Sequence, residues 1–275
     1  MGCEIAVGGA SAAEAAAITR LFQTLERALS RFLPDSDLQR LNNSLAPAVV
    51  VSPLLATALQ DALDAAEATG GIVDPTIASA LEAAGYDRSY SEIHSVSSRG
   101  ADRSGRWREI EITGSFVRRP PGLRLDLNGV VKGRAVDDAL ALLEGNGFVS
   151  AGGDLASRGP LVVSVPGGDT VTLASGALAT SGVTTRNWET TDGRRFHHLI
   201  DPSTNAPADV PWECVSVCAG TCLAADVAAK TAFLLGDDGP GWIEARGLAA
   251  RFVSSGAITT AGNWPRSEAA LVCIS

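Results

Sequence analysis

The two lysines of this chain, Lys132 and Lys230, lie in segments whose composition is typical of binding sites. All other basic residues are arginines, in a total of 22 basic residues. Lys132 lies in LDLNGVVKGRAVDD, and Lys230 lies in TCLAADVAAKTAFLLG. An ammonium is a compact point charge, whereas a guanidinium is a planar fork. The two positions therefore indicate sites that require a compact cation. The alternative is that an arginine-rich genome leaves few lysines anywhere in the chain.

Lys132 follows a segment that has the residues of an anion-binding turn. The pattern LRLDL predicts a strand, Asn128 and Gly129 predict a turn, and a helix is expected from about Val130 to Glu144. Backbone amides at the start of a helix and an ammonium in its first turn would converge on one point, where anions bind. A plain turn with an exposed Lys132 is an equally good interpretation, because the GxxxxGK[ST] phosphate-binding motif is absent.

Two further segments bring polar residues to predicted turns. In GGDLASRG, the residues Gly152, Gly153 and Asp154 predict a tight turn between strands, and close approach of a ligand to the backbone is the alternative. The segments LATSG and RFHHLIDPSTNAP contain one serine, two of the three histidines and one aspartate, namely Ser181, His197, His198 and Asp201. They suggest a hydrolase triad, but the GxSxG motif is missing, so structural histidines are the usual expectation.

Asp226 and Lys230 are spaced by four residues on a predicted helix that Thr221 can cap. Such a pair is ordinarily a helix-surface salt bridge worth a few tenths of a kcal/mol. Asp126 and Asp226 nevertheless offer carboxylates at the ends of two segments. A hard cation such as Mg²⁺ bound to phosphates requires ligands of this kind.

The overall composition limits the classes of function. The chain has 275 residues, 45% of them hydrophobic, which is enough for one large domain or two intimately packed subdomains. Its net charge of −9 opposes binding to nucleic acid or to anionic membranes. An apolar run of about 20 residues, the length of a membrane span, is missing, and the first residues do not resemble a signal peptide. We therefore expect a cytoplasmic protein.

Five cysteines are present, and reduced thiols are the expectation for a chain of this size. The run CVSVCAGTC brings Cys214, Cys218 and Cys222 together and raises the alternative of a thiol-bound metal or an iron–sulfur centre. A fourth ligand with matching spacing is missing, and the alternation around Val215 and Val217 is typical of a buried strand. A metal on these sulfurs is the weaker interpretation.

The elements that must position these residues are helices mixed with strands. Helices are expected at residues 12–29, at residues 53–69 with Ser52 as the N-cap, and at residues 130–144, 223–235 and 241–246. A first strand is expected at residues 4–7, and later strands in WREIEI, LRLDL, FVSA, PLVVSV, TVTLA, GALATS, CVSVCA, AARFVS and ALVCIS. An exposed loop is expected near residue 100. This pattern predicts an α+β fold with largely antiparallel strands in one domain over residues 1–275.

Eight segments in order resemble the ApbE family, the FAD:protein FMN transferases. These segments are MGC, LSRFLPDSDLQRLN, GGIVDPTIASALEAAGY, LDLNGVVKGRAVD, SAGGDL, ATSG, HHLIDPSTNAP and AADVAAKTAFLLG. The resemblance implies a single ApbE-like, T-fold-related domain of two intimately packed α/β subdomains, with FAD between them. It also implies a reaction that cleaves FAD, attaches FMN by a phosphoester bond to a Thr or Ser of a partner protein, and releases AMP.

The resemblance also assigns roles to individual positions. The positions that match the family's flavin contacts are Met1, Phe32, Val73, Asp74, Pro75, Asp126, Lys132, Ser181 and Ile200. Its Mg²⁺ ligands match the backbone carbonyl of Gly129 and the carboxylate of Asp226, and its catalytic groups match His198, Asp226 and Lys132. In this assignment Lys132 and the metal neutralise phosphate charge, and His198 accepts the proton of the attacking hydroxyl.

One departure from the family pattern concerns the metal. Lys230 stands where the family usually has a Thr or Ser whose hydroxyl helps to hold Mg²⁺. An ammonium beside Asp226 would compete with a dication and could take its place. Two alternatives to the transferase follow from this departure. One is an FAD-binding protein that stores or delivers flavin, and the other is an FAD diphosphatase that uses water as the acceptor.

Overall fold

The computed structural model describes residues 2–93, 95–96, 102–264 and 270–271, and the chain divides into two compact units. Unit 1 is made of Gln23–Val131 and Thr185–Ala208 together with Gly2. Unit 2 is made of Cys3–Phe22, Lys132–Thr184 and the chain from Asp209 onward.

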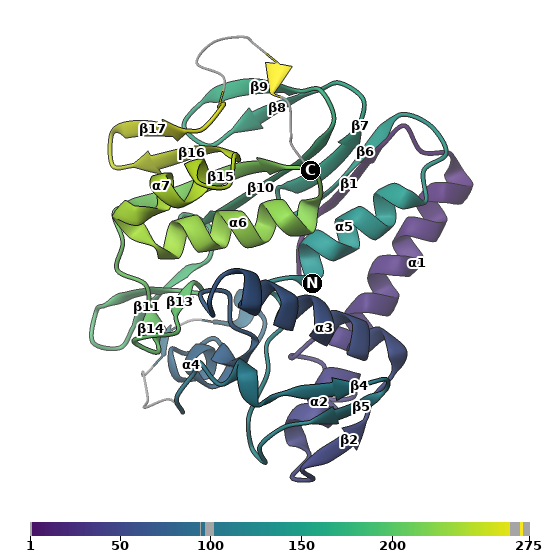
Figure 1. Cartoon of the computed structure of the whole chain (residues 1–275), viewed down its shortest axis with the longest axis vertical. Coiled ribbons are helices and arrows are strands. Elements are labelled where there is room, and N and C mark those ends of the chain that lie inside the picture. The colour runs from purple at the N-terminus through teal and green to yellow at the C-terminus, as the bar shows by residue number, and fades with distance from the viewer. Residues whose placement is uncertain (1, 94, 97–101, 265–269, 272–275) are drawn as a thin grey trace. The chain divides into compact units, whose positions relative to one another are not determined.

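Unit 2 is built on a seven-stranded sheet in which all neighbouring strands are antiparallel. In spatial order the strands are β1 (Ile5–Gly8), β6 (Gly147–Ala151), β7 (Asp154–Arg158), β10 (Gly176–Gly182), β15 (Trp212–Ala219), β16 (Ala249–Ser254) and β17 (Ala257–Ala261). The helices α6 (Cys222–Leu234) and α7 (Gly239–Glu244) lie over β10, β15, β16 and β17 (Figure 1). Helix α5 (Val131–Ala141) begins at the boundary of unit 2.

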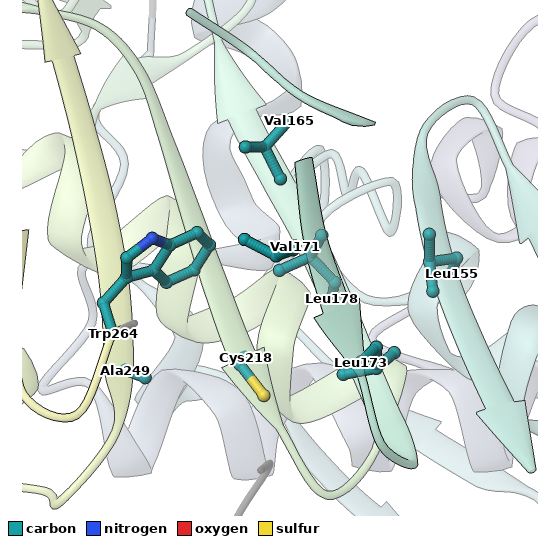
Figure 2. Close-up of a cluster of buried hydrophobic side chains, with 8 residues drawn as sticks. All are labelled: Leu155, Val165, Val171, Leu173, Leu178, Cys218, Ala249 and Trp264. Carbon is teal, nitrogen blue, oxygen red and sulfur yellow. The ribbon is translucent and has the colours of Figure 1, made fainter. Parts of the chain in front are cut away.

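One face of this sheet is covered by the hairpin of β8 (Leu161–Val165) and β9 (Asp169–Leu173), which β18 (Ala270–Leu271) extends. Figure 2 shows the resulting core, in which hairpin residues and Trp264 pack against residues of β7, β10, β15 and β16. Leu155 and Leu178 point into this core. Because side chains alternate along a strand, their neighbours Asp154 and Ala179 face the opposite side of the sheet.

Unit 1 combines short helices with small sheets. Helix α1 (Ala12–Leu29) ends in this unit, and the unit's other helices are α2 (Asp37–Asn43), α3 (Pro53–Ala68) and α4 (Ala78–Ala83), with 3₁₀ turns at Pro75–Ile77, Tyr90–Glu92 and Trp107–Glu109. One sheet has the order β2 (Ala48–Val50), β5 (Phe116–Arg118) and β4 (Glu111–Thr113), and a second has the order β12 (Arg195–His197), β11 (Asn187–Thr190) and β3 (Ser95–Val96). Strands β13 (Ile200–Asp201) and β14 (Ala206–Pro207) form a hairpin. The core of this unit includes Tyr86, Trp188 and Ile200, with Phe32 packed against it.

The α+β prediction is confirmed, and several elements agree closely with their sequence signals. Helix α3 begins as predicted, because Ser52 accepts a hydrogen bond from the Leu55 amide at 3.2 Å and Pro53 occupies its first turn. Gly70 and Gly71 follow its end with φ values of 66° and 90°. In the part of the chain that the structure describes, no helix is both long enough and apolar enough to span a bilayer.

The strand predicted in LRLDL is wrong, because residues 123–127 belong to no strand or sheet. The amide of Leu125 donates to the side chain of Asn42 at 2.8 Å, and the carbonyl of Leu125 accepts from the same side chain at 2.9 Å. The amide of Asp126 donates to the carbonyl of Pro75 at 2.9 Å. A side chain and a loop thus satisfy the backbone groups that a neighbouring strand would otherwise satisfy.

Other predicted boundaries shift by a few residues. WREIEI starts as a 3₁₀ turn before β4, helix 130–144 ends at Ala141, and the helix predicted at 241–246 is α7 at Gly239–Glu244. Part of the loop near residue 100 and the end of ALVCIS lie outside the described residues, as do Met1 and Cys273. The single-domain organisation stays a prediction.

Candidate functional site

Helices α5 and α6 meet closely, and this contact positions Lys132. A Cβ atom on Gly133 would lie 2.7 Å from the Cα of Leu223 and 2.8 Å from the carbonyl oxygen of Cys222. One turn later on α5, the carboxylate of Asp137 accepts the amides of Cys222 at 2.7 Å and of Leu223 at 2.9 Å. Burial raises the pKa of Asp137, although these two hydrogen bonds oppose the shift. The first amides of α6 are therefore already satisfied by the protein.

Lys132 forms an ion pair with Asp154, the first residue of β7. Asp154 is fully buried, and its other oxygen accepts the Thr180 amide at 2.9 Å. Burial raises the pKa of Asp154, and the adjacent Lys132 ammonium opposes this shift. The interpretation of Lys132 as an exposed lysine is wrong, since its side chain is only 22% exposed. The tight turn predicted in GGDLASRG is confirmed, because Gly152 and Gly153, with φ values of 60° and 94°, join β6 to β7. The burial of the Asp154 carboxylate was not predicted.

Asp226 and Lys230 form a second ion pair in the same unit. The Nζ atom of Lys230 lies 2.5 Å from Oδ1 of Asp226, and the Asp226 side chain is 1% exposed. The expectation of a helix-surface salt bridge is therefore wrong. Among the described residues, Oδ2 of Asp226 has no hydrogen-bond partner. The charges of Asp226 and Lys230 both act on Asp154, so the two ion pairs are electrostatically coupled.

Ser181 lies on β10 of the same unit and is buried. Ser181 pairs with Val215 of β15. It lies three residues after Leu178, whose side chain points into the core, so the Ser181 side chain points to the opposite face of the sheet, which also carries Asp154. The other members of the suggested hydrolase triad belong to unit 1. Asp201 has a turn-forming role there, because its carboxylate accepts the amide and hydroxyl of Ser203 at 2.8 and 2.7 Å. These contacts give the hydrolase interpretation no support.

Asp126 in unit 1 is held by a buried arginine that the sequence analysis missed. The Nε atom of Arg31 lies 2.6 Å from Oδ2 of Asp126, and both side chains are at most 3% exposed. The guanidinium carbon of Arg31 lies 4.2 Å from the centre of the Phe32 ring and 4.6 Å from that of Tyr86. Among the described residues, its Nη2 atom has no hydrogen-bond partner. The available signal was the position of Arg31, directly before Phe32 in LSRFLPDS.

The predicted flavin-binding residues of unit 1 are close neighbours. The carbonyl of Pro75 accepts the amide of Asp126 at 2.9 Å, and a Cβ atom on Gly129 would lie 3.5 Å from Val73. Asp74 is buried and accepts backbone amides in its own segment and in the loop around Gly105, at 2.8 and 2.6 Å. Phe32 and Ile200 belong to the same hydrophobic cluster, together with Tyr86 and Trp188. Met1 lies outside the described residues.

The adjacent histidines differ in their surroundings. His197 has its Nε2 atom 3.0 Å from the carbonyl of Ala208 and accepts the Leu199 amide on Nδ1 at 3.3 Å, which is the pattern of a neutral imidazole. Burial lowers the pKa of His197. His198 is half-buried, and its Nδ1 atom lies 3.4 Å from the carbonyl of Arg186. Since a carbonyl only accepts, this contact favours the proton on Nδ1 and a lone pair on Nε2.

The residues predicted to hold Mg²⁺ do not fit a metal site. Mg²⁺ requires nearly octahedral oxygen ligands. One oxygen of Asp226 is already bound by the ammonium of Lys230. Groups of three or more His, Cys, Asp or Glu side chains able to hold a metal are absent from the described part of the chain.

The cysteine run does not form a metal site either. Cys214 and Cys222 are buried and not in disulfides. Burial raises the pKa of Cys214 to about 11 and that of Cys222 well above its usual value, so both stay protonated and bind metal poorly. Cys218 is disulfide-bonded, which makes the expectation of a reduced thiol wrong at this position.

Comparisons with known proteins agree on one family. The model of the ApbE family matches residues 1–252. The chain is 31% identical over 254 residues to an FAD:protein FMN transferase of Salmonella typhimurium, covering 81% of this chain and 72% of that protein. It is 30% identical over 253 residues to the enzyme of the same name from Treponema pallidum, covering 78% of this chain and 69% of that protein.

Two solved structures are similar over nearly the whole chain. A crystal structure of an ApbE protein from Thermotoga maritima aligns with a TM-score of 0.81 at 27% identity and covers 94% of this chain and 93% of that one. A flavin transferase ApbE from Vibrio cholerae aligns with a TM-score of 0.79 at 21% identity and covers 96% and 94%. The second likeness concerns the fold alone.

Proposed function

The chain belongs to the ApbE family, and we propose on this basis that it is an FAD:protein FMN transferase. The observation that carries the proposal is the group of matching positions in unit 1. There, Asp126 contacts Arg31 at 2.6 Å and the carbonyl of Pro75 at 2.9 Å, beside the cluster that contains Phe32 and Ile200. These contacts bring aromatic, cationic and acidic groups together, which is the chemistry that a flavin dinucleotide requires.

The residues of unit 1 suit the ring systems of FAD. Phe32 is half-buried and offers an aromatic surface, and the buried Tyr86 supports it, with the two ring centres 5.5 Å apart. The guanidinium of Arg31 lies against both rings, and its Nη2 atom lacks a partner among the described residues. In the proposed complex that buried N–H group donates to a polar atom of the dinucleotide. Such a contact would satisfy a donor whose burial otherwise costs about 1–3 kcal/mol.

The transfer step is a displacement at phosphorus. A hydroxyl oxygen of the acceptor protein attacks the phosphorus of the FMN half, and a new P–O bond forms. The bond to the bridging oxygen breaks, and AMP leaves with that oxygen and the bonding electron pair. Nε2 of His198 receives the hydroxyl proton, a role supported by the contact of its Nδ1 with the Arg186 carbonyl.

Lys132 is proposed to stabilise charge on the pyrophosphate. Asp154 holds its ammonium, while 22% of the side chain stays exposed. A preorganised cation stabilises the negative charge that develops on phosphate oxygens in the transition state. Ser181 of the same sheet face is a further proposed contact. A Thr or Ser side chain on a partner protein as acceptor, and a cytoplasmic location, are retained from the sequence as predictions.

The test is incubation with FAD and candidate acceptor proteins that expose Ser or Thr. We expect AMP release together with flavin fluorescence on the acceptor band of a denaturing gel. His198→Ala should lower AMP formation by about a hundredfold or more, the contribution typical of an acid–base group, while the FAD Kd stays unchanged. His197→Gln is the matched control and should keep its activity.

Other outcomes identify the alternatives. Free FMN and AMP without a labelled acceptor would indicate an FAD diphosphatase. Tight binding of uncleaved FAD with every acceptor would leave a flavin storage or delivery protein. Absence of FAD binding would overturn the proposal as a whole.

A further inference from the structure

Two carboxylates and two ammoniums lie together inside unit 2. Asp154 is completely buried and paired with Lys132. Asp226 is 1% exposed and paired with Lys230 at 2.5 Å, and Lys230 is itself only 15% exposed. The charges of Asp226 and Lys230 act directly on Asp154. These four residues, called here the charge cluster, are one electrostatic unit rather than two independent pairs.

The charge cluster is neutral when all four groups are ionised, since two negative charges then face two positive ones. Two buried carboxylates without cations would repel each other and pay a large desolvation cost. Lys132 can compensate only one of them. The ammonium of Lys230 supplies the second positive charge, which a bound cation would otherwise have to supply.

A divalent metal conflicts with this arrangement in charge and in ligands. Mg²⁺ on Asp226 would bring two further positive charges next to the ammonium of Lys230, whose Nζ already contacts Oδ1. The remaining oxygen, Oδ2, has no hydrogen-bond partner among the described residues, but a metal bound there would share the carboxylate with the ammonium that contacts Oδ1. Metal binding would therefore require Lys230 to leave Asp226.

We propose that Lys230 is a built-in cation, whose ammonium holds Asp226 in place of the divalent metal implied by the ApbE resemblance. The prediction for this chain is flavin dinucleotide binding that does not depend on Mg²⁺. The part of the proposal that concerns FAD rests on the proposed function. The part that concerns metal rests on the charge cluster alone.

Metal binding is measured first without FAD, by calorimetric titration of Mg²⁺ into the full chain after EDTA treatment. The unmodified protein should give no saturable heat and no shift of its melting temperature. Lys230→Thr removes the ammonium and adds a hydroxyl, so it should bind Mg²⁺ with a melting temperature that rises with metal. The double variant Asp226→Asn, Lys230→Thr is the matched control and should lose this response.

FAD binding is then measured with EDTA and with Mg²⁺. The Kd of the unmodified protein should change by less than about twofold, whereas the Kd of Lys230→Thr should be at least about tenfold lower with Mg²⁺. If Lys230→Thr does not fold, Lys230→Gln, which keeps most of the side-chain volume, replaces it.

The two proposals fail in different ways. Saturable Mg²⁺ binding by the unmodified protein, or loss of FAD binding in EDTA, would overturn the built-in cation. Absence of FAD binding under both conditions would overturn the proposed function, and the metal titration would still decide the role of Lys230.

Discussion

His197 and His198 are neighbours in sequence, yet their ring nitrogens serve different purposes. Both nitrogens of His197 contact the backbone, at 3.0 Å to the Ala208 carbonyl and 3.3 Å to the Leu199 amide. A proton added to Nδ1 would point at the N–H group of Leu199, which is also a donor, so the charged ring would lose this hydrogen bond. His197 is therefore expected to be a structural group that must stay neutral, whereas His198 is the proposed base.

This difference predicts a pH dependence of stability. Burial lowers the pKa of folded His197 below its ordinary value of 6.5. The folded state thus favours the neutral ring, and its stabilisation is present above pH 6.5 and is lost as the pH falls through the folded pKa. His197→Gln should flatten the dependence of the free energy of unfolding on pH between about 5 and about 7.5. Urea unfolding at several pH values measures this effect.

The matched variant for this measurement is His198→Gln. It should keep the pH dependence of the unmodified protein. Equal flattening by the two variants would contradict the assignment of a structural role to His197.

At the scale of elements, the contact of α5 with α6 is what positions the charge cluster. Gly133 and Asp137 lie one turn apart on α5, and both meet the start of α6. Gly133 permits the close approach of α5 to α6, and the Asp137 carboxylate accepts the first amides of α6. Lys132 and Asp226 are therefore presented by two helices whose separation is set by a glycine.

Gly133→Ala should destabilise the protein, against the ordinary preference of helices for alanine. Its Cβ would meet the backbone of Leu223 at 2.7 Å, so the helices must separate. Overpacking of this kind costs about 1–3 kcal/mol, and displacement of Lys132 should lower the FAD affinity as well. Urea unfolding and FAD titration measure the two effects.

Gly241→Ala in α7 is the matched control. A Cβ at this position would meet nothing within 4 Å, so the helix preference should decide and stability should not fall. Equal losses in both variants would contradict the close-packing argument.

The sequence predicts elements well where the signal is local. Ser52, Pro53 and the glycines after residue 69 determine where α3 begins and ends, and all act within one turn of the helix. LRLDL has the alternation of a strand, but its backbone partners include Asn42, which is 83 residues away in the chain. Local pattern carries no information about such a partner.

The candidate site shows the same limit. The motif order identifies positions such as Asp126 and Lys132, but it does not reveal what holds them. The partners of these positions escaped notice, because the burial and ion pairing of Arg31 and Asp154 arise only when distant segments pack together. The expected surface salt bridge between Asp226 and Lys230 was wrong for a related reason. A spacing of four residues allows an ion pair on a helix, but it does not tell whether that pair is exposed or buried.

At the scale of the whole molecule, the charge balance of the site matters as much as its cations. Arg31, Lys132 and Lys230 each contact a buried carboxylate. These three pairs are close to neutral when seen from a distance, while the whole chain carries a net charge of −9. Long-range attraction of an anionic dinucleotide is therefore not expected.

The association rate of FAD should reflect this balance. Steered association of opposite charges slows steeply as salt is added. Here the rate constant should stay constant or rise slightly from about 20 to about 300 mM NaCl, because salt screens only the repulsion by the acidic chain. Stopped-flow measurement of flavin fluorescence gives the rate. Asp154→Asn, which removes the charge beside Lys132, should bind faster at low salt and slow down as salt rises. A tenfold fall in the unmodified protein would instead require a positive site whose charge the described carboxylates do not balance.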